Sequence, residues 1–241
     1  MAITYPLSTP TSIGIANVTL AANNAVAVSQ SPFTFKQQVI AHQGQRWSAS
    51  VSIPPVRRNL AEPWVSFLMS LKGQVGTFLL GDPNCKVAQG VISDSSKWFL
   101  ASGTWGDLGL WVDSISYAED ASSLVFADIK VDSTQTAGTD SLLVKGLQPS
   151  TEGFFYAGDY IQLGSASGAT LHKVLQQVDS DASGNATLEI WPELRKTAND
   201  GDAIIVENTV GVFRLVNSSQ SWDIDNRSAY GISFDAVEAI T

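Results

Sequence analysis

The sequence predicts a mainly β protein with one packed α-helix, in which a first unit is split by an inserted unit of short strands. Composition is the first observation, since Gly, Ser, Thr and Val are plentiful in a chain of 241 residues that is only 15% charged. Short runs in which apolar and polar residues alternate are the second. The third is an uneven distribution of charge between the ends of the chain and its middle.

The charge distribution indicates two structural units. Residues 86–207 carry 17 acids and 7 bases, whereas residues 1–85 and 208–241 together carry 6 acids and 7 bases. The middle is therefore at −10 and the two ends together at +1. We expect 1–85 and 208–241 to form one discontinuous domain and 86–207 an inserted acidic β-rich domain; two consecutive domains are the alternative. An acidic middle disfavours phosphate binding there.

The N-terminal segment is predicted to form strands separated by turns. Apolar residues alternate on both sides of a turn expected at Asn23-Asn24, and alternation returns at Phe33 and Phe35. From Trp47 to Ile53 apolar residues alternate with serines. This pattern predicts a strand with one buried face, ended by Pro54-Pro55.

One amphipathic helix follows. Its apolar residues fall on a single stripe at helical spacing and are the expected core of the helix: Leu60, Trp64, Phe67, Leu68 and Leu71. Asn59 is the expected N-cap, Glu62 and Pro63 suit the first turn, and Gly73 suits the C-terminal cap. We expect a buried strand over Val75–Leu80 directly after the helix.

The middle of the chain is predicted to consist of short strands and polar loops, as in a small barrel or sandwich. The expected strands are Trp98–Ala101, Leu108–Val112, Ser141–Lys145, Asp159–Leu163, Thr170–Val178 and Ala186–Trp191. Alternation returns at Phe213 and Leu215 and again over Tyr230–Ala236. We expect this last strand to pair with the N-terminal strands, which would make the first unit discontinuous.

Residues that carry chemistry are few, and the sequence predicts no catalytic site, cofactor or metal. Cys85 has no partner for an internal disulfide and is expected to be a small packing residue. His42 and His172 lie in strand-like settings and are expected to be structural. There is no apolar run of transmembrane length and no signal peptide at the start of the sequence, so we expect no membrane insertion.

Two further patterns were weighed. Asp179–Gly184 matches the first half of an EF-hand calcium loop, but Ile190 stands where the bidentate Glu should be, so a hairpin turn with Gly184 at positive φ is favoured. Trp98, Trp105, Trp111 and Trp191 have faces that stack on sugars, and core or interface anchoring is the favoured alternative. Trp105 and Trp111 are the candidate saccharide contacts.

The order and spacing of several stretches resemble the distal tail proteins of long-tailed, non-contractile (siphovirus-type) bacteriophages. The resemblance runs from about residue 33 to residue 239, while residues 90–130 lie outside it and resemble an extra segment. The stretches that carry it are Phe33–Val39, Trp47 with Pro54-Pro55, Glu62–Leu68, Leu71–Phe78, Gly158–Gly164, His172–Val174, Asp181–Gly184, Trp191–Arg195, Phe213–Leu215, Tyr230–Phe234 and Glu238-Ala239.

The resemblance implies a structural virion protein, made in the cytoplasm of the bacterial host, that is not an enzyme. Such proteins have a β-sandwich frame with one packed α-helix, split by an inserted small β-barrel-like domain, which here implies that 1–85 and 208–241 are the ring-forming domain. They form a homo-oligomeric, typically hexameric ring between the tail tube protein and the hub or tail-tip proteins. DNA passes through the ring without specific binding. A carbohydrate-binding β module of a tail tip and, less favoured, a polysaccharide hydrolase with spatially paired carboxylates are the alternatives.

A closed ring requires head-to-tail contacts between two different surfaces of each subunit, and strand edges can provide them. The long alternating strands are therefore the expected sources of interface residues. These candidates are Trp47, Val51, Ile53, Tyr230, Ile232 and Phe234.

Overall fold

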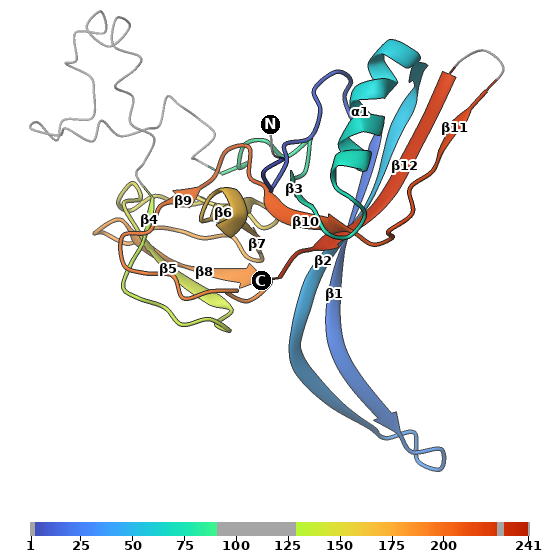
Figure 1. Cartoon of the computed structure of the whole chain (residues 1–241). Coiled ribbons are helices and arrows are strands. Elements are labelled where there is room, and N and C mark those ends of the chain that lie inside the picture. The colour runs from blue at the N-terminus through green and yellow to red at the C-terminus, as the bar shows by residue number, and fades with distance from the viewer. Residues whose placement is uncertain (1–2, 91–128, 226–228, 241) are drawn as a thin grey trace, which may run out of the picture. The chain divides into compact units, whose positions relative to one another are not determined.

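The computed structural model describes residues 3–90, 129–225 and 229–240 and confirms a mainly β fold (Figure 1). The chain divides into two compact units, described here as the first and the second unit. The first contains Met1–Lys86, Gly164–Leu171 and Asn208–Thr241, and the second contains Val87–Leu163 and His172–Glu207. These boundaries differ from the expected ones mainly in Gly164–Leu171, which the sequence placed in the insertion.

The first unit is built on a six-stranded sheet with the order β1-β2-β12-β10-β3, in which β11 also pairs with β12. Its elements are β1 (Asn17–Gln30), β2 (Gln37–Arg57), α1 (Arg58–Ser70), β3 (Thr77–Leu80), β10 (Gly211–Leu215), β11 (Trp222–Ile224) and β12 (Ala229–Glu238). The unit differs from the expected two-sheet sandwich because α1, and not a second sheet, packs against β2 and β12.

The two ends of the chain meet in this sheet. β12 lies antiparallel to β2 with Phe234 opposite Val51 and Ala236 opposite Ala49. The predicted pairing of the last strand with the N-terminal strands is therefore confirmed. Side chains at these positions are buried, because the alternating apolar residues of both strands lie on one face of the sheet.

The strand predictions for the first 57 residues need three corrections. Asn23-Asn24 is no turn, since β1 runs through it with a register shift between Asn24 and Val26. Phe33 and Phe35 belong to the turn that joins β1 to β2, and not to a strand. Pro54-Pro55 does not end β2. These residues lie beyond Ser52, the last residue of β2 that pairs with β1, so β2 is an edge strand on that side. A proline there, which has no N–H, removes no hydrogen bond between strands.

The helix α1 begins one residue before the expected N-cap. Arg57 occupies the N-cap position without a side-chain hydrogen bond, so the N-cap role expected for Asn59 is wrong. Arg58 and Glu62 form an ion pair one turn apart, 3.0 Å between Nε and Oε1, and Pro63 lies inside the helix. The C-cap is Leu71, so the capping role expected for Gly73 is wrong; Gly73 lies two residues further on, with φ 68°.

The predicted stripe of α1 faces the core with one exception. Trp64, Phe67, Leu68 and Leu71 are buried, whereas Leu60 is 37% exposed and does not belong to the core. Aromatic rings fill the space between helix and sheet: Trp64 lies 6.3 Å from Phe234, and Phe78 lies 5.5 Å from Phe67, 6.0 Å from Phe234 and 6.4 Å from Phe213 (ring centroids). Val75, at the expected start of the next strand, is exposed and precedes β3.

The second unit is a small barrel, as predicted. Its sheet has the order β4-β5-β8-β7-β6-β9, from β4 (Lys130–Val131), β5 (Ser141–Lys145), β6 (Tyr160–Leu163), β7 (Thr170–Val174), β8 (Asn185–Trp191) and β9 (Ile204–Ile205). The sheet closes because Val131 N–H donates to Asp202 O and Ile204 N–H to Ile129 O, each at 2.9 Å. The strands expected at Trp98–Ala101 and Leu108–Val112 lie outside the described residues.

The short segment Gly164–Leu171, which includes the 3₁₀ turn η3 (Ala166–Gly168), packs in the first unit. The buried Trp47 indole Nε1–H donates to Leu171 O at 2.9 Å. A side chain at Gly211 would lie 3.0 Å from the Leu171 Cβ, so β10 passes this segment closely. The indole of Trp47 thus ties β2 to a segment 124 residues further along the chain.

Candidate assembly surface

The interface residues expected from the sequence are core residues of the single chain. Trp47, Val51, Ile53, Ile232 and Phe234 are all 5% exposed or less. Tyr230 is half-buried and lies opposite Val56 of β2. From Trp47 to Ser52, β2 also has β1 on its other side, so the strand edges expected to pair across subunits are occupied within the chain. The interface prediction is corrected accordingly.

The surface that extends away from this core is the far part of the β1–β2 hairpin, residues 23–46, called here the arm (Figure 1). β12 pairs with β2 only from Ser48 onward, so the arm consists of two strands alone. Within the arm all residues are exposed except Ser31 and Gln45, which are partly buried. A two-stranded ribbon of this kind is marginally stable in water and gains stability by packing on another surface.

Both faces of the arm carry exposed aliphatic residues. Val26 lies opposite Ala41 and Val28 opposite Val39, so these four aliphatic side chains share one face, called here the inner face of the arm. The other face is mixed, since Ala27 lies opposite Ile40 and Ser29 opposite Gln38. The exposed fractions of Val26, Val28 and Val39 are 50%, 59% and 58%. The inner face is therefore an aliphatic surface in contact with solvent.

The tip of the arm is a tight turn that presents two phenylalanines. Ser31 N–H donates to Lys36 O at 3.0 Å, and Phe35 N–H donates back to Ser31 O at 2.9 Å. Phe35 has φ 55°, an uncommon backbone conformation for an aromatic residue. Phe33 is 92% exposed and Phe35 73% exposed. The turn thus holds two aromatic side chains out in solvent.

A bulge marks the base of the arm. The register shifts between Asn24 and Val26, and a side chain on Gly44 would come within 2.9 Å of the Ala25 Cβ. Glycine therefore permits the close approach of the two strands there. Asn23 Nδ2 donates to Ser48 Oγ at 2.8 Å and fixes the strands on the body side of the bulge.

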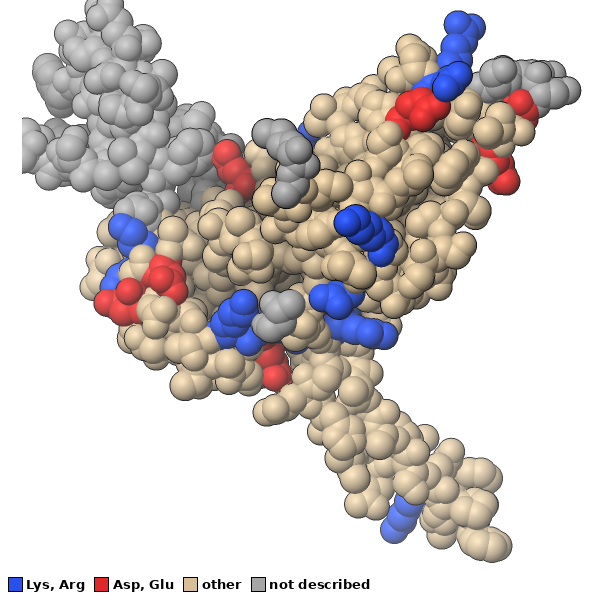
Figure 2. Space-filling model, viewed as in Figure 1, with Lys and Arg blue, Asp and Glu red and all other residues tan. Residues whose placement is uncertain are grey.

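The arm differs in charge from the rest of the chain. It contains Lys36 and Arg46 and no acid, so it holds +2 of a net charge of −9, and the remaining residues hold −11. Figure 2 shows the arm as a tan surface with little colour on it. The arm is thus weakly cationic on an acidic protein, and most of its surface is uncharged.

His172 is a core residue of the second unit, as the sequence indicated. It is fully buried, and its Nδ1 lies 2.7 Å from Pro192 O. Burial lowers the pKa of His172 to about 4; the hydrogen bond to Pro192 opposes this shift and the charge of Arg195 adds to it. The imidazole is therefore neutral at pH 7 and packs in the barrel wall.

The candidate calcium loop is a hairpin turn. Asp181 accepts hydrogen bonds from the backbone N–H groups of Ser183 and Asn185 at 2.7 and 2.8 Å, and these bonds lower the pKa of Asp181. Gly184 has the predicted positive φ, at 78°. Among the described residues there is no group of three or more His, Cys, Asp or Glu side chains that could hold a metal ion.

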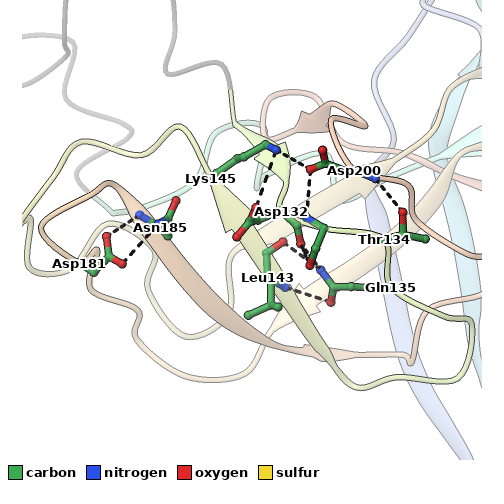
Figure 3. A network of polar contacts seen from close by, with 9 residues as sticks. Asp132, Thr134, Gln135, Leu143, Lys145, Asp181, Asn185 and Asp200 are labelled. Atoms are coloured by element: carbon green, nitrogen blue, oxygen red, sulfur yellow. Dashed lines mark hydrogen bonds and ion pairs between the residues drawn. The ribbon is translucent and has the colours of Figure 1, made fainter.

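A polar network fixes the loop between β4 and β5 (Figure 3). Lys145 bonds to Asp200 and lies 3.8 Å from Asp132 (Nζ to Oδ1). The hydrogen bond from Lys145 lowers the pKa of Asp200. Gln135 accepts a bond from Leu143 N–H and donates to Leu143 O, both at 3.1 Å. The charged groups are exposed to solvent and paired with one another, so we assign the network a structural role in holding the conformation of this loop.

The remaining sequence candidates are not brought together. Cys85 is half-buried, His42 lies exposed on the arm, and Trp191 is half-buried in β8. Trp98, Trp105 and Trp111 lie outside the described residues, so the saccharide hypothesis stays a prediction.

The arm is a single long hairpin, whereas alternation in the sequence predicts separate short strands there, because Asn23-Asn24 favours a turn. The run from Asn23 to Arg46 does carry a signal, since it combines alternating aliphatic residues, two phenylalanines and no acid in a chain with 23 acids.

No protein-family model matches the sequence, and no curated protein matches it significantly. None of the helices in the described part of the chain has the length and hydropathy needed to cross a membrane.

Proposed function

We propose that this protein is a structural ring subunit at the distal end of a bacteriophage tail tube. In this role it joins the tube to the hub or tail tip, leaves a channel for DNA, and works in the virion. The observation that carries the proposal is the arm, which exposes an aliphatic face and two phenylalanines on a ribbon of only two strands. Such a surface belongs to a protein whose fold is completed by assembly.

The open sheet of the first unit supports the same function. β1 is the terminal strand of its sheet and has one neighbour, β2. An edge strand and a projecting arm are two different surfaces, as head-to-tail contacts in a closed ring require. The order of motifs that resembles distal tail proteins then suggests which ring this is.

The outer face of the sheet suits a channel through which DNA moves. Ser48, Ser50 and Ser52 point away from the core, and the residues opposite them on β12 include Ser233 and Asp235. Small hydroxyl side chains and a carboxylate release few counterions from DNA, so a face of this composition binds phosphates weakly. We propose that this face lines the channel.

The test is an image of the assembled particle with this chain labelled, together with native mass spectrometry of the purified chain. The expected result is a closed ring of subunits, with the label between tube and tip. A label elsewhere in the particle, or turnover of a polysaccharide that one Asp or Glu substitution abolishes, would overturn the proposal.

A further inference from the structure

The end of the barrel at which β6 begins and β7 ends carries two segments that lie outside the strands. Phe154 N–H donates to Val178 O at 2.9 Å, and Val178 N–H donates to Phe155 O at 3.0 Å, so residues 151–156 and 177–180 run side by side. Segments of this kind are frequent positions for ligand sites, because the barrel holds them rigidly while solvent reaches them.

Tyr156 is an exposed aromatic residue on this end of the barrel, with an exposed fraction of 43%. Its ring lies against Gly153, where a Cβ would come within 2.7 Å of Tyr156 Cε1. Its backbone N–H donates to Oδ2 of the buried Asp159 at 2.8 Å. The ring is therefore held in place with part of its surface open to solvent, and a rigid ring of this kind loses little entropy when it contacts a ligand.

The same glycine positions a carboxylate beside the ring. Gly153 N–H donates to Asp179 Oδ1 at 2.7 Å, and Gln177 Nε2 donates to the same oxygen at 3.3 Å. The bond from Gly153, and after it the bond from Gln177, lowers the pKa of Asp179, so the carboxyl is ionised at neutral pH. Asp179 Oδ2 accepts no hydrogen bond from any described residue, so this oxygen is available to a ligand.

Two neighbouring carboxylates lack such an available oxygen. Asp159 accepts from Gln89 N–H with Oδ1 and from Tyr156 N–H with Oδ2, and Asp181 uses both of its oxygens for groups of its own turn. These two side chains fix the backbone. Asp179 differs because one oxygen fixes its orientation and the other points to no described partner.

The chemistry of this pair of side chains matches an uncharged sugar. The C–H face of a sugar ring stacks on an aromatic ring, and a sugar hydroxyl donates a strong, charge-assisted hydrogen bond to a carboxylate. Residues 129–163 and 172–207 of the second unit carry 11 acids and 5 bases, a net charge of −6. A negative unit disfavours nucleic acids and phosphorylated glycans as ligands.

We propose that Tyr156 and Asp179 form a binding site for a neutral saccharide on the second unit. Tyr156 stacks on one sugar ring, and Asp179 Oδ2 accepts a hydrogen bond from one of its hydroxyls. The site goes beyond the proposed ring function and is independent of it, because both residues lie in one unit of a single chain. It also differs from the saccharide contacts that the sequence predicts, Trp105 and Trp111.

The test measures binding of neutral oligosaccharides to the full chain by saturation-transfer NMR, with titrations for the dissociation constants. The probes are cellotetraose, maltotetraose and tetra-N-acetylchitotetraose. Choline chloride is added as a cationic probe, because an aromatic ring beside a carboxylate also attracts quaternary ammonium groups. We expect saturation transfer to the C–H protons of at least one oligosaccharide and none to choline.

Substitutions locate the binding. Tyr156→Ala should raise the dissociation constant at least about tenfold, whereas Tyr156→Phe, which keeps the ring, should leave it within about threefold. Asp179→Asn should raise it about threefold to tenfold, because a neutral amide oxygen is a weaker acceptor. Phe33→Ala removes an aromatic side chain of the arm that is 92% exposed, and as the matched control it should leave binding within about twofold. Thermal unfolding of each variant checks that the fold is intact.

The outcomes decide between this site and its alternatives. Binding that Tyr156→Ala leaves unchanged would place the saccharide elsewhere on the chain and overturn the site. Saturation transfer to none of the three oligosaccharides, or to choline in their place, would overturn a neutral saccharide as the ligand. The ring function is tested separately, by the position of the labelled chain in the particle.

Discussion

The two units of this chain solve the edge problem of β-sheets in opposite ways. In the second unit, hydrogen bonds between Val131 and Asp202 and between Ile129 and Ile204 close the sheet into a barrel around its own core. In the first unit the sheet stays open, and β1 and β2 continue past the body as the arm. Closure removes edges, whereas an open sheet with a bare ribbon keeps surfaces for other molecules. The difference supports the proposal that assembly is concentrated in the first unit.

The largest effect is expected where the open sheet depends on its helix. Trp64 is fully buried between α1 and β12. Trp64→Ala should lower the free energy of unfolding by about 3–5 kcal/mol, because a large cavity opens between α1 and the sheet. Met69→Ala, at a position of α1 that is 65% exposed, is the control and should change it by less than about 0.5 kcal/mol. Equal midpoints in urea for both variants would show that α1 does not hold this sheet.

The closed unit should show a pH dependence that comes from His172. His172 has its pKa lowered from 6.5 to about 4 in the fold, so the unfolded chain binds a proton that the folded chain refuses. Stability is fully present above about pH 6.5 and falls by about 3 kcal/mol in total as the pH drops through 4. Urea midpoints of wild type and His172→Gln at several pH values isolate this contribution. Identical pH profiles for the two chains would contradict it.

A smaller effect is expected where Gly164–Leu171 joins the first unit. Trp47→Phe keeps a six-membered aromatic ring but removes the five-membered ring of the indole, with the N–H that donates to Leu171 O. The loss of the buried hydrogen bond should cost about 1–2 kcal/mol, and the cavity left by the missing atoms adds to this cost. Trp222→Phe, at a half-buried position of β11, is the matched control and should cost less than about 0.5 kcal/mol. Thermal unfolding that ranks the two variants in the reverse order would contradict this.

The smallest effect is expected on the arm. Val28→Ala removes a side chain that is 59% exposed, and should change the stability of the monomer by less than about 0.5 kcal/mol. The same substitution at Val144, which is fully buried in β5 of the barrel, should cost about 2 kcal/mol. A comparable loss at both positions in dilute protein would mean that the arm is packed within the single chain.

The sequence predicted those parts of the fold in which alternation and burial agree. Correct predictions were the buried face of Trp47–Ile53, the apolar stripe of α1 and the pairing of β12. In these elements almost every alternating apolar residue is buried by other residues of the same chain. Alternation misled at Phe33 and Phe35, where a period of two occurs in a turn.

The interface prediction failed for a related reason. Strands such as Tyr230–Ala236 have the composition of an assembly edge and of a core strand alike, and only the pairing partner distinguishes the two. The exposure of the arm was not predicted, because the residues from Asn23 to Arg46 do not indicate that β1 and β2 extend beyond the part of the sheet that α1 covers. Which residues have no cover is a property of the three-dimensional arrangement.

The most direct test of the central claim is hydrogen exchange of the arm amides, measured on dilute monomer and on concentrated protein. The claim is that a single chain leaves the arm uncovered and that assembly covers it. We predict fast exchange over Val26–Gln30 and Gln37–Ala41 in the monomer and strong slowing on self-association, while the amides of β5 and β8 stay slow in both samples. Arm amides that are as protected as those of the barrel in the monomer, or equally fast in both samples, would contradict the account.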